Sequence, residues 1–177
     1  MAHQEQNTFF RGVKEMYPQY FYDTKVIEIG SLNINGTVRT LFDEPKEYIG
    51  LDLGEGPDVD IVCPGQDYQG EDNYFDVSIS AECFEHNPYW LETMINMYRI
   101  TKPDGLIAFT CASQGRAEHG TVRTSPEDSP FNYESDYYRN LNAEDFDDFI
   151  KDYKFKDFKF EYNPKTCDLY FWGIKPI

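Results

Sequence analysis

Short apolar runs alternate along this chain with segments of helical periodicity, and this alternation limits its fold more than any other feature. Runs rich in β-branched residues occupy 25–30, 48–52, 75–80 and 106–110, and each is bounded by turn signals. Neighbouring parallel strands need crossover connections that cover both faces of a sheet. The sequence therefore predicts an α/β domain with a doubly wound, mainly parallel sheet. A further candidate strand, 59–62, follows the second too closely for a helical crossover.

The expected helices lie before and between these strands. Thr8–Tyr17 has apolar residues at helical spacing and is followed by Pro18, which predicts an amphipathic helix on the sheet. Thr37–Phe42 is a candidate short helix between the first two strands. After the third strand we expect a helix with Asn87 as its N-cap and Pro88 at its first position.

The last third of the chain begins with a long polar stretch, 111–140, that shows no clear element. A loop of this length usually carries function. Leu141–Phe146 combines an Asn cap, an acidic third position and a Leu-to-Phe staple, which predicts a helix running to about Tyr153. Phe158–Tyr162 and Leu169–Ile174 then predict a C-terminal antiparallel hairpin.

Length and charge narrow the classes of partner. The 177 residues support one domain, 1–177. Acidic residues outnumber basic ones 32 to 16, giving a formal net charge of -16, so nucleic acid and anionic lipid would be repelled. The chain shows neither an apolar run of membrane-spanning length nor a signal peptide, so we expect a cytoplasmic protein.

The cysteines are widely spaced and form no CxxC pair. This spacing predicts reduced, buried thiols, with neither a zinc site nor a disulfide framework, and we expect no metal site. The four are Cys63, Cys83, Cys111 and Cys167.

The segment from Glu28 to Gly36 follows the first strand and opens the first crossover, where glycines permit close backbone approach to a ligand. It lacks both the G-x-G-x-x-G fingerprint and a P-loop lysine, which disfavours a dinucleotide. Glu28, two residues before Gly30, could attract an ammonium group. Asp52 ends the second strand, where a carboxylate can accept bonds from ribose hydroxyls. Together these residues predict a nucleoside ligand without phosphates.

Four segments, in this order, resemble motifs of the class I S-adenosylmethionine-dependent methyltransferases: VIEIG, YIGLDL, FDVSISAECFEH and MYRITKPDGLIAFT. The resemblance runs from about Lys25 to the C-terminal hairpin. The loops EIGSLNINGTVR and GRAEHGTVRTSP look like those of a small single-domain group within that superfamily. The resemblance implies a Rossmann-like sheet of up to seven strands with an antiparallel last strand, and S-adenosyl-L-methionine as cofactor.

The resemblance also implies which residues contact the cofactor. Two departures from the family pattern are the missing later glycines of the first loop and Pro64, where many relatives place an acid that binds the adenine amine. Adenine recognition is therefore expected from Gln66, Asp67 and backbone groups. The alternative is that these residues serve only as ordinary strand ends and turns. The expected cofactor residues are Glu28, Gly30, Ser31, Asn35, Gly36, Asp52, Gln66, Ser80 and Ala81.

The acceptor side is expected in the loops after the later strands. His86 and His119 are two of three histidines, and either imidazole could remove a proton from a hydroxyl acceptor. Both are named as catalytic candidates, with His119 favoured and also placed at the substrate; packing is the alternative for His86. Arg116 could clamp a substrate carboxylate or phosphate, or form a structural ion pair with Glu118 or another acid. A tyrosine group could either line the acceptor pocket or cap the sheet: Tyr133, Tyr137 and Tyr138.

These observations favour a methyltransferase that uses in-line displacement on a small-molecule or sugar-type acceptor, by O- or N-methylation. Two alternatives stay open. One is a nicotinamide-dependent oxidoreductase, which shares the β-α-β start but normally carries the missing glycine fingerprint. The other is a non-catalytic module that binds the nucleoside and performs no acceptor chemistry. The sequence indicates neither the acceptor nor the oligomeric state.

Overall fold

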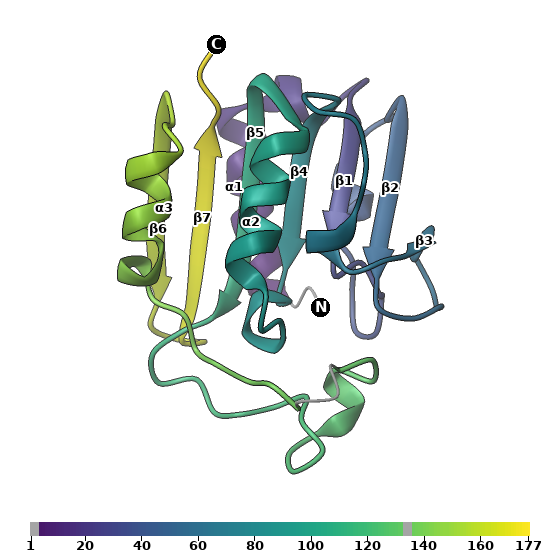
Figure 1. The fold of residues 1–177 in the computed structure, drawn as a ribbon, viewed down its shortest axis with the longest axis vertical. Helices are drawn as coiled ribbons and strands as arrows, with labels where there is room; N and C mark the ends of the chain where they lie inside the picture. The colour runs from purple at the N-terminus through teal and green to yellow at the C-terminus, as the bar shows by residue number, and fades with distance from the viewer. Residues whose placement is uncertain (1–3, 133–135) are drawn as a thin grey trace.

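The computed structural model describes residues 4–132 and 136–177. They form a single seven-stranded sheet in the order β3-β2-β1-β4-β5-β7-β6, with helices on both faces (Figure 1). The strands are β1 Lys25–Ile29, β2 Glu47–Asp52, β3 Ile61–Val62, β4 Phe75–Ala81, β5 Thr101–Ala112, β6 Asp157–Asn163 and β7 Asp168–Ile174. The α-helices are α1 Gln4–Met16, α2 Trp90–Ile100 and α3 Asp147–Asp152.

Strand direction changes once, at the C-terminal hairpin. β1 to β5 pair in parallel with their neighbours, whereas β7 lies antiparallel between β5 and β6. The predicted α/β fold, with a mainly parallel sheet of seven strands and an antiparallel C-terminal strand, is confirmed. The carboxyl ends of β1, β2 and β4 meet at the lower edge of the sheet in Figure 1.

Two apolar layers hold the helices to the sheet. On one face, Phe10 and Val13 of α1 are fully buried in a cluster that includes Val26 of β1. On the other face, Met94 of α2 and Phe149 of α3 belong to a second cluster beneath the opposite side of the strands. Each such side chain stabilises the fold by about 1.5 to 3 kcal/mol through removal of apolar surface from water. The sheet edge that carries the loops is therefore rigidly supported from both faces.

The connection from β1 to β2 differs from the prediction. The helix expected at Thr37–Phe42 is only a 3-10 turn, Arg39–Leu41. The Arg39 guanidinium donates to the backbone oxygens of Asp58 and Tyr48, each at 3.3 Å, and pairs with Asp60 at 3.0 Å. Because a side chain satisfies these loop carbonyls, the crossover is ordered without a full helix.

The short strand β3 pairs in parallel with β2 although no helix connects them. Its pairing covers only two residue pairs, Leu51 with Ile61 and Asp52 with Val62. The Asp60 carboxylate accepts a hydrogen bond from the Gly50 backbone N–H at 2.7 Å. This hydrogen bond fixes the turn between β2 and β3. It thereby sets the register of the two strands, which a crossover helix would otherwise do.

The start of α2 was predicted wrongly. The helix begins at Trp90, so neither Asn87 nor Pro88 occupies the expected cap and first position. Asn87 instead accepts a hydrogen bond from the Tyr89 backbone N–H at 2.8 Å and donates to the Thr93 hydroxyl at 2.8 Å. Its side chain therefore links the turn before the helix to the first helical turn, from a position two residues before the N-cap, Tyr89.

The start of the last helix follows the sequence signal. Asn142 and Asp145 form the expected capping box, with the Asn142 backbone N–H donating to the Asp145 carboxylate at 2.8 Å. Leu141 and Phe146 are fully buried. The first turn, Ala143–Phe146, is a 3-10 helix that continues into α3.

The described parts of the long loop, 113–132 and 136–140, run beneath the carboxyl edge of the sheet (Figure 1). Within the residues described, its helical part is one 3-10 turn, Pro126–Asp128. Across residues 4–132 and 136–177, none of the helices has the length and apolar character needed to cross a bilayer.

Candidate active site

A cleft of about 640 Å³, open to solvent, lies at the carboxyl edge of the sheet. It is bounded by the ends of β1, β2 and β4 and, from the long loop, by 128–131. This is where ligands bind in open α/β sheets, outside the carboxyl ends of the strands. The lining residues are Ile29, Gly30, Leu32, Ile34, Leu51, Asp52, Leu53, Cys63, Pro64, Gly65, Glu82, Cys83, His86, Asn87, Asp128, Ser129, Pro130 and Phe131.

Gly30 forms the floor of the cleft after β1. Its φ of +76° lies in the left-handed region, and a Cβ built there would stand 2.6 Å from the Cβ of Cys83. The backbone N–H groups of Gly30 and Ser31 donate to the Leu51 carbonyl at 2.8 and 3.0 Å. Only glycine therefore allows the chain to turn here while β1, β2 and the segment after β4 stay in contact.

Asp52 projects from the end of β2 into the same cleft. One carboxylate oxygen accepts the Leu32 backbone N–H at 3.0 Å and the other accepts the Leu53 N–H at 2.7 Å. Burial raises the pKa of this carboxyl above its usual value. A carboxylate offers about four lone-pair sites, so each oxygen keeps capacity for one more donor. The carboxylate is thus fixed in orientation and can accept hydrogen bonds from two hydroxyl groups.

Several expected cofactor residues lie outside the cleft lining. Ser80 is fully buried and donates to the Ile29 carbonyl at 2.8 Å. Gln66 accepts a hydrogen bond from the Thr93 hydroxyl at 3.2 Å. Where Gln66 was expected, the lining comes from Cys63, Pro64 and Gly65. The expected residues that the cleft lining does not include are Glu28, Ser31, Asn35, Gly36, Gln66, Ser80 and Ala81.

Glu28 is buried within β1 beside the cleft, with 3% of its surface exposed. The Tyr48 hydroxyl donates to its carboxylate at 2.5 Å. Burial raises the pKa of Glu28 to about 7, against the opposing effect of this hydrogen bond. The structure therefore places the expected ammonium-binding acid in a protein hydrogen bond.

Glu82, which is not among the expected cofactor residues, lines the cleft directly after β4. It adopts φ +52°, and burial together with the nearby Glu85 carboxylate raises its pKa well above the usual value. A non-glycine residue held in the left-handed region stores backbone strain, and such outliers concentrate at functional sites. The signal available in the sequence was the density of ionisable residues in SAECFEH.

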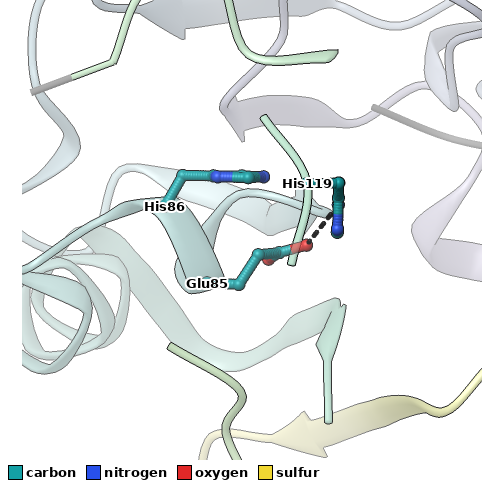
Figure 2. Close-up of side chains that lie close together, drawn as sticks. All are labelled: Glu85, His86 and His119. Carbon is teal, nitrogen blue, oxygen red and sulfur yellow. Dashed lines mark ion pairs between the residues drawn. The ribbon is translucent and has the colours of Figure 1, made fainter. Parts of the chain in front are cut away.

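Glu85, His86 and His119 form a compact cluster where the long loop meets the 3-10 turn Phe84–His86 (Figure 2). The His86 and His119 ring centroids are 5.1 Å apart, and one His119 nitrogen, Nε2, lies 3.9 Å from a Glu85 carboxylate oxygen. Glu85 is fully buried. Sequence reasoning named both histidines and missed the acid, because only the returning loop makes it their neighbour.

Hydrogen bonds define the orientation of His119. Its Nδ1 lies 3.1 Å from the Ala117 carbonyl oxygen and 3.3 Å from the Tyr138 hydroxyl, which itself donates to the same carbonyl. A carbonyl only accepts, so Nδ1 carries a proton, and in the neutral ring Nε2 then carries the lone pair. His86 contacts both His119 and Tyr138 through its ring. Burial, followed by the nearby His119, lowers the pKa of His86 to about 3, so its ring is neutral at physiological pH.

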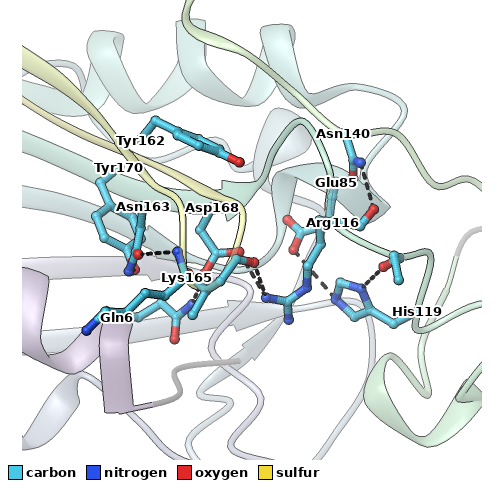
Figure 3. A network of polar contacts seen from close by, with 12 residues as sticks. Gln6, Glu85, Arg116, His119, Asn140, Tyr162, Asn163, Lys165, Asp168 and Tyr170 are labelled. Carbon is cyan, nitrogen blue, oxygen red and sulfur yellow. Dashed lines mark hydrogen bonds and ion pairs between the residues drawn. The ribbon is translucent and has the colours of Figure 1, made fainter.

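Arg116 pairs with a buried acid of the sheet. Its guanidinium donates to the Asp168 carboxylate at 3.1 Å and to the Thr166 carbonyl at 2.9 Å (Figure 3). Asp168 is fully buried and also accepts a hydrogen bond from Gln6 of α1 at 2.8 Å. Glu118, the partner suggested by sequence, pairs with Arg123 instead. The arginine expected at the substrate thus anchors the long loop to β7.

The tyrosine group expected near the acceptor is described only in part. Tyr133 lies outside the described residues. Tyr138 packs against both histidine rings, with ring centroids 5.5 Å from His86 and 5.2 Å from His119. His119 is not itself among the residues that line the cleft, and it reaches that space through its contact with His86.

A family model described as a methyltransferase domain matches residues 35–109. None of the curated proteins matches the chain. Among solved structures, Haemonchus contortus phosphoethanolamine N-methyltransferase 2, in complex with S-adenosyl-L-methionine, superposes with a TM-score of 0.69 at 18% identity. That match covers 98% of this chain and 53% of the other, so this chain spans about half the length of the nematode enzyme.

Two bacterial structures match over nearly their whole length. The YcgJ protein from Bacillus subtilis gives a TM-score of 0.65 at 11% identity, covering 99% of this chain and 100% of that chain. Burkholderia thailandensis 1,6-didemethyltoxoflavin-N1-methyltransferase, with bound 1,6-didemethyltoxoflavin and S-adenosylhomocysteine, gives 0.62 at 15% identity, covering 100% and 92%. The resemblance seen in the sequence is confirmed. Residues 35–109 thus match a methyltransferase domain, and the chain shares the fold of the methyltransferase structures to which it is similar.

Proposed function

We propose that this protein transfers the methyl group of S-adenosyl-L-methionine to an oxygen or nitrogen atom of a small-molecule acceptor. The bond that breaks joins the methyl carbon to the sulfonium sulfur, and the bond that forms joins it to the acceptor atom. S-adenosylhomocysteine leaves with the sulfur electron pair. Most of the acceleration in such a displacement comes from alignment of the reacting atoms and exclusion of water.

The observation that carries this proposal is the orientation of Asp52 in the cleft. Two backbone N–H groups fix its carboxylate while each oxygen retains a site for another donor. The 2′ and 3′ hydroxyls of a ribose supply two adjacent donors, which suits this group. Gly30 lines the cleft next to it, and among the described lining residues there is no Lys or Arg to hold a pyrophosphate.

The adenine is proposed to lie against the apolar lining residues Leu53, Cys63 and Pro64. The methionine end would then extend toward Gly30 and the strained Glu82, past the end of β4. In this arrangement Glu28 acts behind the cleft wall, through its bond to Tyr48. The other expected residues outside the lining would serve by holding the loops that line it.

The acceptor is proposed to enter at the His86 end of the cleft. There His119, which contacts the cleft-lining His86, would take a proton from an acceptor hydroxyl through Nε2. A small molecule fits the chain's net charge of -16, which disfavours polyanionic partners. Relatives in fold that methylate phosphoethanolamine and didemethyltoxoflavin, at the low identities given above, are consistent with an acceptor of this size.

Calorimetric titration with S-adenosylhomocysteine tests the cofactor assignment. Asp52→Ala should weaken binding by roughly 1 to 3 kcal/mol, the effect of losing hydrogen bonds to a charged group. Glu55→Ala, an exposed acid three residues further along the same loop, should bind like the wild type. NAD should not bind. Binding of NAD in preference to S-adenosylhomocysteine would establish the oxidoreductase alternative, and equal affinity of both variants would remove Asp52 from the ribose site.

Methyl transfer must be measured separately from cofactor binding. Incubation with labelled S-adenosyl-L-methionine and a panel of small hydroxyl and amine acceptors should release S-adenosylhomocysteine. His119→Ala should lower transfer to a hydroxyl acceptor about 100-fold to 10,000-fold while leaving S-adenosylhomocysteine affinity intact. A protein that binds the cofactor but turns over none of the panel would favour the non-catalytic alternative.

A further inference from the structure

The cluster of Glu85, His86 and His119 contains more hydrogen-bond acceptor atoms than donor atoms. Glu85 is fully buried, and neither of its carboxylate oxygens has a hydrogen-bond partner in the part of the chain that the structure describes. The Nδ1 atom of His86 is likewise buried without a partner among those residues. Leaving such polar atoms unsatisfied costs about 1 to 3 kcal/mol each, and more for a charged group.

The third member of the cluster adds another electron pair. In neutral His119, whose Nδ1–H donates to the Ala117 carbonyl, the Nε2 lone pair faces the Glu85 oxygen 3.9 Å away. Two acceptors that face each other at this distance gain nothing from one another. A hydrogen bond from the remote ring nitrogen to a backbone carbonyl is the arrangement that typically orients a histidine toward a metal ion.

The geometry admits a metal ion with small adjustments. One ligand atom from each side chain lies within 4.8 Å of the others. Even with all separations at this limit, a central point would lie about 2.8 Å from each atom, so shifts of about 0.7 Å would reach the 2.0–2.2 Å bonds that zinc forms with His and Glu. The loop supports such contact because Gly120, at φ +60°, has no side chain to displace the His86 ring.

We propose that Glu85, His86 and His119 bind one divalent transition-metal ion, of the type that prefers imidazole nitrogen and carboxylate oxygen. Two histidines and one carboxylate leave at least one coordination position open, as in catalytic zinc sites. That position would face the cleft because His86 also lines it. If the proposed function holds, an acceptor oxygen would bind there. While an ion is bound, His119 Nε2 is a ligand and is not free to act as a base.

The absence of CxxC pairs was the reason to expect no metal in the sequence analysis. That argument addresses thiolate sites only. The present cluster joins neighbours on one turn to a histidine from the long loop, a combination that local spacing does not reveal.

The test is metal binding by the untagged, metal-stripped chain. Zn²⁺ should bind with a stoichiometry of one per chain, and Co²⁺ should give a visible absorption band that Zn²⁺ abolishes. Glu85→Gln and His119→Ala should each weaken Zn²⁺ binding by at least roughly 100-fold, since even indirect partners of metal ligands change affinity by about 10- to 100-fold. Glu127→Gln, at an exposed position of the long loop, is a matched control for Glu85→Gln that should bind like the wild type.

The outcomes separate this inference from the proposed function. Thermal melting of each variant confirms that it is folded, and if Glu85→Gln does not fold then the less buried His119 carries the comparison. Zn²⁺ binding that is absent, or unchanged in both cluster variants, overturns the metal site. S-adenosylhomocysteine titration of the same metal-free samples reports on the cofactor cleft alone, so either hypothesis can fail without the other.

Discussion

Replacing Glu28 by Gln isolates the energetic effect of one buried carboxyl. Glu28 is 3% exposed, and Tyr48 is its hydroxyl donor at 2.5 Å. Burial raises its pKa from 4.5 to about 7. Glutamine has nearly the same shape and keeps an oxygen that can accept the Tyr48 proton, but it cannot ionise. The variant therefore changes the titration while leaving the packing intact.

The sign follows from proton linkage. Because the folded state holds the proton to higher pH than the unfolded state, the folded state binds more protons between about pH 4.5 and 7. Ionisation of Glu28 thus destabilises the wild type progressively as pH rises through this window. The difference between the two pKa values corresponds to a loss of roughly 3 kcal/mol in the free energy of unfolding, and the full loss is reached above about pH 7.

Urea unfolding of both proteins at several pH values from 5 to 8 measures this effect. The stability of Glu28→Gln relative to wild type should rise with pH by roughly 3 kcal/mol, or roughly 6 to 12 °C in Tm. Contributions from other titrating groups cancel in the difference. Glu15→Gln, an exposed position on α1, controls for the loss of one negative charge. Parallel stability curves for wild type and Glu28→Gln would refute the reasoning.

Three further substitutions test packing and anchoring by thermal or urea unfolding. Gly30→Ala should destabilise the folded protein by about 1 to 3 kcal/mol, because Gly30 has a positive φ and the new Cβ would make a 2.6 Å contact. The control Gly12→Ala, on an open part of α1, should stabilise the protein by roughly 0.5 to 1 kcal/mol. A more stable Gly30→Ala than Gly12→Ala would contradict this reasoning. Arg116→Ala should lower the free energy of unfolding by about 3 to 5 kcal/mol, because it leaves a buried carboxylate without its charged partner. Arg123→Ala, at an exposed ion pair, should lower it by less than about 1 kcal/mol. Similar losses in both variants would contradict the anchoring role of Arg116. Asn142→Ala should cost about 1 kcal/mol through loss of the capping box, and no change in stability would contradict that role.

The sheet could be predicted from sequence because its signals are local. The central strands are compact apolar runs, and the two C-terminal segments are close enough in sequence to form the hairpin of β6 and β7. The connections were less predictable. The Arg39 side chain orders a loop through carbonyl contacts with residues remote in sequence, and Asn87 bonds across a turn instead of capping α2.

The cleft shows the same division between local and long-range information. Gly30 and Asp52 were predictable as lining residues because strand direction alone takes the chain to that edge. Ser80 was expected there too, but its side chain turns into the sheet and bonds to the neighbouring strand. The importance of Glu85 depends on how the long loop folds back, which no local pattern encodes.

The long loop returns, before the last helix, to the end of β5 from which it starts. Asn140 donates to the Arg116 carbonyl at 2.9 Å, and the Leu141 N–H donates to the Ala112 carbonyl at 2.9 Å. Arg116 is itself fixed to Asp168. The described residues between these contacts, 117–132 and 136–139, are attached to the sheet at one closed base, so substitutions among them should have little effect on the sheet. We expect 121–127, a part of this segment outside both the cleft lining and the histidine cluster, to tolerate exchange between related scaffolds while the nucleoside-binding strands stay unchanged.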